Sequence, residues 1–349
     1  MLTSSDGYAV TVPDQLVRLP HSRGPISEAI IRALSHNPTA VKFPSLGNID
    51  MLDDDDGQLA LWCCYELHYS SFAGVDDDWE WEPGLLAARR ELERQFVARL
   101  VDEVRPTPTY SAGAVRSALV DLANGDGPSL STFLLEHGTR VQMREFLVHR
   151  SIYQRKEADP HTWAIPRLRD RAKAAMVTIQ YDEYGKGAAD AMHAELFATT
   201  MRAFDLDPAF GAYLDMLPGS TLATDNLVTM FGLHRKWRAA CIGHLALFEM
   251  TSVVPMNRYA RALQRLGIGP AARRFYDVHV TADESHQHIA LDDMVAGLIE
   301  QEPAAAGDVL FGAQALALVE SRFTEHLLNA WRDRQPSLLR PLVMNRVAS

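Results

Sequence analysis

Apolar residues recur at helical spacing along almost the whole chain, and this periodicity leaves few architectures open to it. The clearest example, Leu85–Val104, reads LLAARRELERQFVARLVDEV and would form about five helical turns, ended by Pro106. Alternation with period two is confined to Val10–Val12 and Val278–Val280, which are too short to indicate a sheet. The sequence therefore predicts an all-α bundle, because helices with one apolar face must bury that face against each other.

Short loops that contain Gly or Pro, such as NGDGP, ADPHTWAIP and GIGP, separate the expected helices. We expect helices over Ile26–Ser35, Gln58–Phe72, Leu85–Val104, Ala112–Asn124, Ser129–Glu157, Arg167–Tyr184, Ala188–Phe204, Asn226–Thr251, Asn257–Gly267, Pro270–Glu300 and Ala315–Asp333. Residues with metal-binding side chains concentrate in the later part of the chain. We therefore divide it into an N-terminal helical part, residues 1–126, and a metal-binding helical bundle, residues 127–349.

The composition and net charge of the chain indicate which kinds of molecule it can bind. The chain has 349 residues, 47% of them hydrophobic, and no run approaches the ~18 apolar residues of a membrane span. The first residues lack the pattern of a secretory signal, and three cysteines cannot form a disulfide framework, so we expect a cytoplasmic protein that binds no membrane. The net charge of −11 disfavours nucleic acid, whose phosphates bind basic surfaces. We expect a small-molecule substrate, and a homodimer is left open.

One expected helix carries three metal-type side chains at spacings of four and seven residues. The stretch Phe275–Asp293 reads FYDVHVTADESHQHIALDD and contains His279, Asp283 and His286. At about 100° per residue these side chains project from one stripe of the helix. Two imidazoles and a carboxylate suit iron, zinc or manganese. An exposed polar helix face would give the same spacing, so the interpretation depends on whether other donors exist.

Two further acids are candidate donors. Glu249 stands alone in the apolar segment CIGHLALFEMTS, where an unpaired buried carboxylate would cost several kcal/mol, so we expect it to bind a cation. Glu157, in YQRKEADPH, lies at the end of an expected helix before a Pro that stops it. Taken alone, Glu157 has the character of a surface residue.

Glu183 and His193 form another candidate pair in QYDEYGKGAADAMHAELF. Ten residues of straight helix would separate them by about 15 Å, too far for two donors to one cluster. Gly185 and Gly187 lie between them, and glycine is where a helix can break and return the carboxylate to the imidazole. The carboxylates that compete for this role are Asp190, which is three residues before the histidine, Asp182 and Glu195.

Together these segments resemble the heme-oxygenase-like di-iron oxidases and oxygenases, a group also described as iron-containing redox enzymes. The similar phrases are KEADPHTWAIPRL, DEYGKGAADAMHAELF, GHLALFEMTS and FYDVHVTADESHQH, which lie within about residues 140 to 295. The resemblance implies a heme-oxygenase-like helical bundle that contains two iron ions and no heme. It implies that four helices supply the metal ligands Glu157, Glu183, His193, Glu249, His279, Asp283 and His286.

The resemblance also implies O2 as co-substrate and an external electron donor. With these seven donors, we expect Glu249 to bridge the two irons. A carboxylate ten residues before the histidine is similar to the N-oxygenating branch of the family, so we expect oxygenation of an amine or guanidine on an amino-acid-like molecule. Asp190 keeps open a desaturase or oxidative C–C lyase that acts on a fatty acid or amino acid. A non-catalytic iron-binding helical protein is the third hypothesis. Arg150, Arg167 and Arg235 are candidates to bind a substrate carboxylate.

Overall fold

The chain is helical throughout the part that the computed structural model describes, which is residues 16–39, 43, 47, 49–104, 111–125 and 127–342. In these ranges the only paired extended residues are Val17 and Phe72, which form an isolated bridge. Val10–Val12 lie outside the described residues, and Val278–Val280 lie inside a helix. The prediction of an all-α fold is confirmed.

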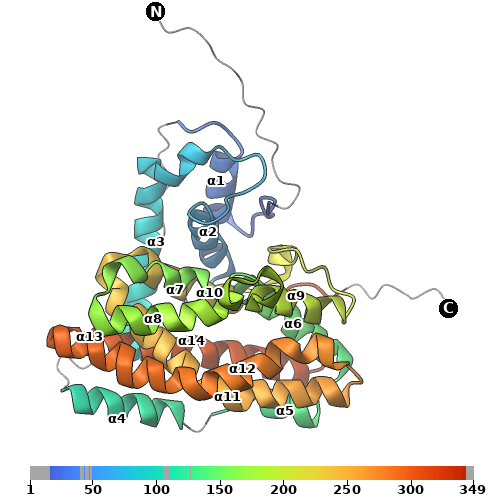
Figure 1. Cartoon of the computed structure of the whole chain (residues 1–349). Coiled ribbons are helices and arrows are strands. Elements are labelled where there is room, and N and C mark those ends of the chain that lie inside the picture. The colour runs from blue at the N-terminus through green and yellow to red at the C-terminus, as the bar shows by residue number, and fades with distance from the viewer. Residues whose placement is uncertain are drawn as a thin grey trace, which may run out of the picture.

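Figure 1 shows long helices stacked in the lower part of the view, with the helices of the first hundred residues rising above them. A π-helical segment, η7 (Ile289–Val295), joins the long helix α12 to the short helix α13, and 3-10 turns join other helices. The α-helices are α1 (Pro25–Leu34), α2 (Asp55–Glu66), α3 (Pro83–Val104), α4 (Ala112–Ala123), α5 (Leu130–Glu136), α6 (Arg140–Gln154), α7 (Asp159–Thr162), α8 (Asp170–Glu183), α9 (His193–Arg202), α10 (Gly219–Leu233), α11 (Arg238–Arg265), α12 (Pro270–His288), α13 (Ala296–Gln301) and α14 (Ala306–Arg332).

Polar residues determine where several helices begin. Asp54 accepts a hydrogen bond from the backbone N–H of Gly57 at the start of α2, and Ser111 does the same for Ala114 in α4. Thr139 begins α6 with a capping box, in which its side chain and that of Gln142 each accept from the other residue's backbone N–H. These caps satisfy N–H groups that the first helical turn leaves without partners.

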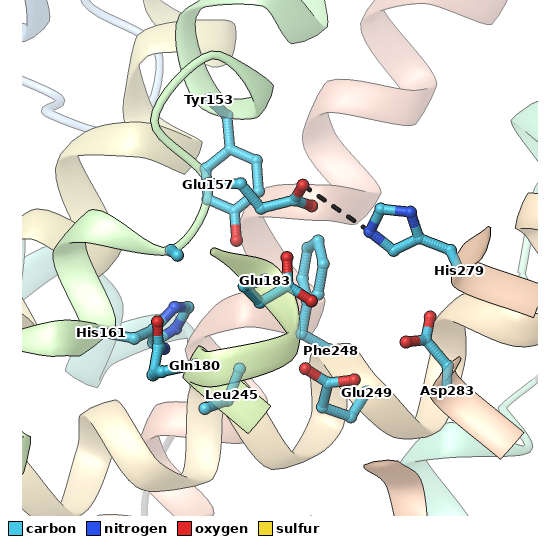
Figure 2. Close-up of a pocket in the computed structure, with 11 residues that line it drawn as sticks. Tyr153, Glu157, His161, Gln180, Glu183, Leu245, Phe248, Glu249, His279 and Asp283 are labelled. Atoms are coloured by element: carbon cyan, nitrogen blue, oxygen red, sulfur yellow. Dashed lines mark ion pairs between the residues drawn. The ribbon is translucent and has the colours of Figure 1, made fainter. Parts of the chain in front are cut away.

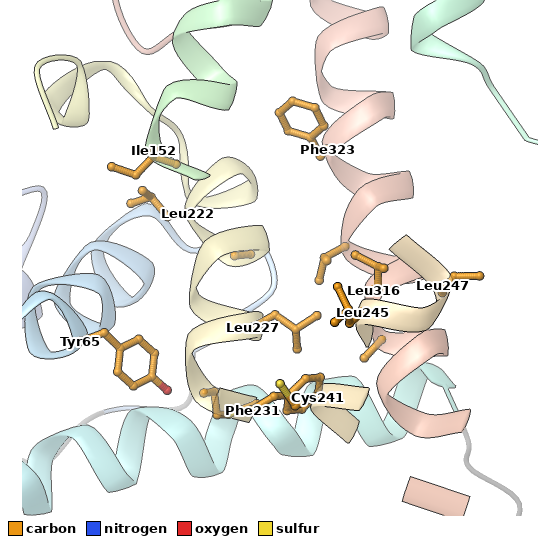
Figure 3. Close-up of a cluster of buried hydrophobic side chains, with 14 of the residues drawn as sticks. Tyr65, Ile152, Leu222, Leu227, Phe231, Cys241, Leu245, Leu247, Leu316 and Phe323 are labelled. Atoms are coloured by element: carbon orange, nitrogen blue, oxygen red, sulfur yellow. The ribbon is translucent and has the colours of Figure 1, made fainter. Parts of the chain in front are cut away.

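The centre of the bundle is the contact between α11 and α14. A Cβ at Gly243 would lie 1.8 Å from the carbonyl oxygen of Val309, and a Cβ at Gly312 would lie 1.9 Å from that of Ala240. Only glycine allows two helix backbones to come this close. Figure 3 shows the buried apolar side chains of α10, α11 and α14 that surround this contact, Leu227 among them.

We expect Gly243→Ala to destabilise the fold by about 3 kcal/mol, because the added methyl group would force α11 and α14 apart. Gly113→Ala is the matched control, since a Cβ at this helical position meets nothing within 4 Å. It should be neutral or stabilise by about 0.5 kcal/mol. Urea unfolding followed by circular dichroism measures both effects. Equal stability of the two variants would contradict the close contact.

The N-terminal helices are packed onto the bundle in different places. α2 lies against α1 and α10, and α3 contacts α14. α4 lies along α11 and α14, on the opposite side of the bundle from α2 in Figure 1. The division into residues 1–126 and 127–349 stays a prediction, and the contacts of α2 and α4 show that the two parts share packing surfaces.

Several predicted helix boundaries are wrong, and the helix expected over Ala315–Asp333 begins earlier, at Ala306. Three differences concern where helices are divided. The expected helix Ser129–Glu157 is two helices, since the chain turns at Gly138, where a Cβ would lie 2.7 Å from the Leu134 carbonyl oxygen. The expected helix Asn226–Thr251 is divided by a 3-10 turn at residues 235–237, which no Gly or Pro marks. In contrast, α11 continues through Pro255, because a proline removes a single backbone hydrogen bond and the surrounding helices hold the rest.

The segment Arg235–Arg265, which includes α11, is long and apolar enough to cross a membrane. This corrects the expectation that no segment reaches that length and apolarity. Its most apolar window is 67% buried inside the protein, and it carries Glu249 on a buried face. α11 is therefore placed as the core helix of the bundle, where such apolarity is expected.

Candidate metal centre

Separate parts of the bundle bring the seven predicted donors into one region. None of the seven side chains belongs to a residue more than 8% exposed. Figure 2 shows the carboxylates of Glu157, Glu183, Glu249 and Asp283 gathered in one space, with the imidazole of His279 beside them. The donors are Glu157 in the turn after α6, Glu183 at the end of α8, His193 at the start of α9, Glu249 in the middle of α11, and His279, Asp283 and His286 on α12.

The loop between α8 and α9 brings Glu183 to His193. Gly185 has φ +64°, and a Cβ there would lie 2.5 Å from the backbone of Ala191, so the loop folds back on itself only with glycine at this position. As a result, Oε2 of Glu183 lies 2.7 Å from Nδ1 of His193. The helix interruption predicted from the glycines is confirmed. Asp190 is exposed on this loop, away from the buried donors.

Four donors form a first group. Glu157, Glu183, His193 and His279 each offer an atom, and these atoms lie within 4.8 Å of one another. Nε2 of His279 lies 3.7 Å from Oε2 of Glu157, the pair marked in Figure 2. Nδ1 of His279 donates a hydrogen bond to the carbonyl oxygen of Phe275 at 2.7 Å, and this orients Nε2 toward the group. A histidine held through one ring nitrogen presents the other to a metal.

A second group consists of Glu183, Glu249 and His286, with ligand atoms again within 4.8 Å of one another. Nδ1 of His286 lies 3.5 Å from Oε2 of Glu249 and 3.5 Å from Oδ1 of Asp283. Nε2 of His286 lies 3.1 Å from Oδ2 of Asp182. Asp283 is not part of either group, but it lines the same space from the next helical turn.

The residue common to both groups is Glu183, whereas Glu249, the expected bridge, belongs to one of them. The bridging position of Glu249 stays a prediction. Glu183 ends α8 between the other donors, whereas Glu249 approaches from α11 on the side of His286. The sequence does not predict which carboxylate lies between the two groups, because the relative positions of Glu183 and Glu249 depend on how α8 and α11 cross. Among the competing acids, Asp182 contacts His286, and Glu195 forms an ion pair with Arg155 at 2.9 Å.

Several donor atoms are buried and form no hydrogen bond of normal geometry, which is the test of whether a cation fits. They are Oδ1 of Asp283, Nδ1 of His286, and the facing pair Oε2 of Glu183 and Nδ1 of His193, which lie close together but are not oriented as donor and acceptor. Buried polar atoms are almost always paired, and each unpaired one costs about 1–3 kcal/mol. Carboxylate and imidazole donors in this arrangement fit divalent iron, zinc or manganese. The residues present therefore fit a metal centre.

The pKa values show how strongly these groups interact when no cation separates them. Burial raises the pKa of Glu249 to about 8. Burial opposes the charge on His279, yet the adjacent Glu157 outweighs it and raises the pKa of the imidazole to about 10. In the same way, the nearby carboxylates of Asp283 and Glu249 outweigh burial and raise the pKa of His286 to about 11. Without metal, protons therefore occupy the place of the cations.

Two residues support the donors and were not singled out for this role by the sequence. Ser252 donates a hydrogen bond to Oδ2 of Asp283 at 2.5 Å, and Asp182 contacts the outer nitrogen of His286. Partners of this kind fix the orientation of metal ligands. Ser252 lies three residues after Glu249 on α11, and Asp182 lies one residue before Glu183, so proximity to a donor was the available signal. The π-helical η7 begins three residues after His286, and such segments are frequent at functional sites.

A small cavity lies among the donors, where α6, α7, α8, α11 and α12 meet. Its volume of about 10 Å³ is room for one water molecule. His161 lies at this cavity with Nε2 3.1 Å from Nδ1 of the buried His244, and burial lowers the pKa of His161 to about 4, so it is neutral. None of the described residues that line the cavity is Lys or Arg. The lining residues are Tyr153, Glu157, Ala158, His161, Gln180, Glu183, Leu245, Phe248, Glu249, His279 and Asp283.

An all-α bundle with buried carboxylates and imidazoles around a small cavity defines a class of metal-dependent helical enzymes. The family model described as iron-containing redox enzyme matches residues 144–321, which is about half of the chain and includes every predicted donor. The chain belongs to this heme-oxygenase-like family, as the sequence resemblance indicated, and is an iron-containing oxidoreductase. No curated protein matches the sequence significantly.

Proposed function

We propose that this chain is a non-heme di-iron enzyme that uses O2 to oxygenate the nitrogen of an amine or guanidine on an amino-acid-like small molecule. The observation that supports it most is that Glu183 belongs to two separate groups of buried donors. One group alone would suit a single ion. A carboxylate shared between two groups favours a pair of ions, which is the arrangement that helical bundles use for di-iron centres.

The residues that would hold the ions divide into two sets. Glu157, His193 and His279 would hold one ion, Glu249 and His286 the other, and Glu183 would lie between them. Asp283, held by Ser252, would complete the set near His286. Four carboxylates would balance the four positive charges of two ferrous ions, which favours burial of the whole centre. When bound, the ferrous ions supply electrons to O2, and an external donor restores them.

The lining of the cavity favours a neutral or cationic part of a substrate over its carboxylate. Among the residues that the structure describes, no lysine or arginine lines the cavity to neutralise a buried carboxylate. The arginines proposed for that task are engaged elsewhere, since Arg150 binds Glu320 at 2.8 and 2.6 Å and Arg167 donates to backbone carbonyls. Arg235 is exposed. The carboxylate of an amino-acid-like substrate would therefore lie outside this cavity.

Other side chains of the cavity would orient the substrate and exclude water. His161 and Gln180 offer neutral hydrogen-bonding groups at one end, and Leu245 and Phe248 form an apolar wall. A neutral imidazole can accept a hydrogen bond from an amine N–H without adding charge. Removing water strengthens these interactions and keeps the reaction apart from solvent.

The proposal is tested with protein loaded anaerobically with Fe(II). We expect two irons per chain, an absorbance change within seconds of mixing with O2, and hydroxylamine or nitro products when amines and guanidines are supplied with a reductant. Metal analysis, stopped-flow spectroscopy and mass spectrometry measure these results. Asp190→Ala, which alters an exposed acid, is the matched control and should behave as the unchanged protein. O2 consumption with these substrates but no nitrogen-oxygenated product would contradict the proposal.

A desaturase or oxidative C–C lyase is the second candidate, because the same centre could act on carbon. The apolar wall of Leu245 and Phe248 favours it, since an alkyl chain could pack there. Alkene or cleavage products from fatty acids or amino acids in the same assay would support this candidate. An iron-loaded protein without any O2-dependent absorbance change would instead indicate a non-catalytic iron-binding protein.

A further inference from the structure

A buried lysine lies next to the candidate ligand Glu157 in the chain. Lys156 is 6% exposed, and its Nζ lies 3.0 Å from Oδ2 of Asp225 and 3.6 Å from Oε2 of Glu66. Both carboxylates are themselves at most 1% exposed. A buried charge of this kind persists only when opposite charges pair with it. This cluster is separate from the donors described above, and nothing in the proposed chemistry uses it.

Aromatic rings complete the surroundings of the lysine. Its Nζ lies 4.0 Å from the ring centre of Tyr69, 5.6 Å from that of Trp62 and 5.4 Å from that of Phe210. Ammonium groups at these distances are attracted to the faces of aromatic rings. Trp62 also donates a hydrogen bond from Nε1 to Oδ2 of Asp225 at 2.8 Å. The lysine side chain is therefore held from several directions at once.

Three of these contacts come from the N-terminal part of the chain, about ninety residues before the lysine. Trp62 and Glu66 belong to α2, Tyr69 follows it directly, and Asp225 belongs to α10, on which α2 is packed. The family model begins only at residue 144, so it contains Lys156 but not α2. Lys156 is thus a point at which the preceding helices contact the metal-binding bundle.

Lys156 and Glu157 are neighbours in one tight turn of the backbone. α6 ends at Gln154, and the chain then turns tightly into α7. In this turn the Lys156 N–H donates to the carbonyl oxygen of Tyr153 at 2.9 Å, and its own carbonyl accepts from the Asp159 N–H at 3.0 Å. These two hydrogen bonds hold the backbone of Lys156 on both sides. Glu157 is the next residue in the same tight turn, so its side chain leaves the backbone directly beside the anchored lysine.

We propose that Lys156 is a positioning residue through which α2 fixes Glu157 in the metal centre, so that residues before the family region are required for full metal affinity. The inference depends on the proposed function only in taking Glu157 as a metal ligand, and it is independent of the substrate. A cluster that merely stabilised the fold would leave the coordination of a bound ion unchanged. The centre of a folded variant would then be spectroscopically normal.

The test measures Co(II) binding and the Co(II) ligand-field spectrum of the full chain with Glu66→Gln or Lys156→Met. We expect both variants to bind Co(II) about tenfold to a hundredfold more weakly, with an altered spectrum, as is typical when a residue that orients a metal ligand is removed. Lys156→Arg, which keeps the charge, should recover part of the affinity. Circular dichroism confirms that each variant is folded, and if Lys156→Met does not fold, Glu66→Gln decides.

Glu93→Gln is the matched control. Glu93 is another buried acid of the N-terminal part, and it joins Tyr65 of α2 to His234 of the bundle at 3.0 and 2.8 Å, but it has no ligand beside it. It should leave Co(II) binding unchanged. Normal affinity and spectrum in folded Glu66→Gln, or an equal loss in Glu93→Gln, would overturn the inference. Absence of Co(II) binding by the unchanged protein would instead overturn the proposed metal centre itself.

Discussion

Replacement of Glu183 by alanine is expected to remove both ions and abolish the reaction with O2. Glu183 is the donor shared by the two groups, whereas Glu249 belongs to one of them. Loss of a residue that only orients a ligand costs about 10–100-fold in metal affinity, so loss of a shared ligand should cost more at each position. Metal analysis after gel filtration should find less than one iron per chain. Stopped-flow mixing with O2 should show no absorbance change.

Glu249→Ala distinguishes a shared ligand from an ordinary one. It should keep the ion that the first group holds and therefore retain close to one iron per chain. Asp190→Ala, an exposed acid seven residues after Glu183 in the same loop, should retain both ions and the full O2 reaction. If Glu183→Ala kept one ion while Glu249→Ala lost both, Glu249 would be the shared ligand, as the sequence alone suggested.

The sequence predicts those parts of the centre that depend on local geometry. His279, Asp283 and His286 lie on one stripe because a helix repeats every 3.6 residues, and the structure places all three on α12. Gly185 allows the sharp turn that returns Glu183 to His193, and glycine is recognisable in a sequence for that property. The apolar surroundings of Glu249 predict its burial for the same local reason.

Features that depend on contacts between distant segments could not be predicted. Whether Glu183 or Glu249 is common to both groups of donors depends on the angle at which α8 crosses α11. That angle cannot be predicted from the sequence of either helix. The contact of Asp182 with His286 joins residues more than a hundred positions apart. The pairing of Lys156 with Glu66 likewise depends on the docking of α2.

The positions of the helix ends also depend partly on local sequence and partly on contacts between distant segments. The helix break at Gly138 contains a glycine, but the sequence does not predict the break because the apolar pattern continues on both sides of it. The 3-10 turn at residues 235–237 contains no Gly or Pro, and the nearest glycine, Gly232, lies inside the last turn of α10. Pro255 predicts an interruption that does not occur, since the buried helix α11 is held by its neighbours along its length.

Metal binding by this chain is expected to release protons and to strengthen steeply as the pH rises. Without metal, the pKa of His279 is about 10 and that of His286 about 11, because neighbouring carboxylates outweigh burial, while burial raises the pKa of Glu249 to about 8. All three groups therefore hold protons at pH 7. A cation needs their lone pairs, so close to three protons should leave per chain, and overall affinity should rise up to about a thousandfold per pH unit near neutrality.

The stability of the metal-free protein and that of the metal-bound protein are expected to depend differently on pH. Without metal, the raised pKa values of His279 and His286 stabilise the folded state below pH 6.5, and this contribution is lost as the pH rises through 10 to 11. The raised pKa of Glu249 also makes the folded state less stable as the pH rises from about 4.5 to 8, because the folded state binds the extra proton. Bound cations replace these protons, so the increase in melting temperature on adding Fe(II) or Co(II) should be larger at pH 8 than at pH 6.

Calorimetric titration of Co(II) in buffers of different ionisation enthalpy counts the released protons, and Glu249→Gln provides the internal check. That variant keeps the shape of the side chain but has no proton to lose, so its count should fall by close to one at pH 7. Affinity that is independent of pH, or an unchanged count in Glu249→Gln, would show that protons do not occupy the ligand positions. The unpaired atoms of Asp283 and His286 would then be satisfied by water rather than reserved for a cation.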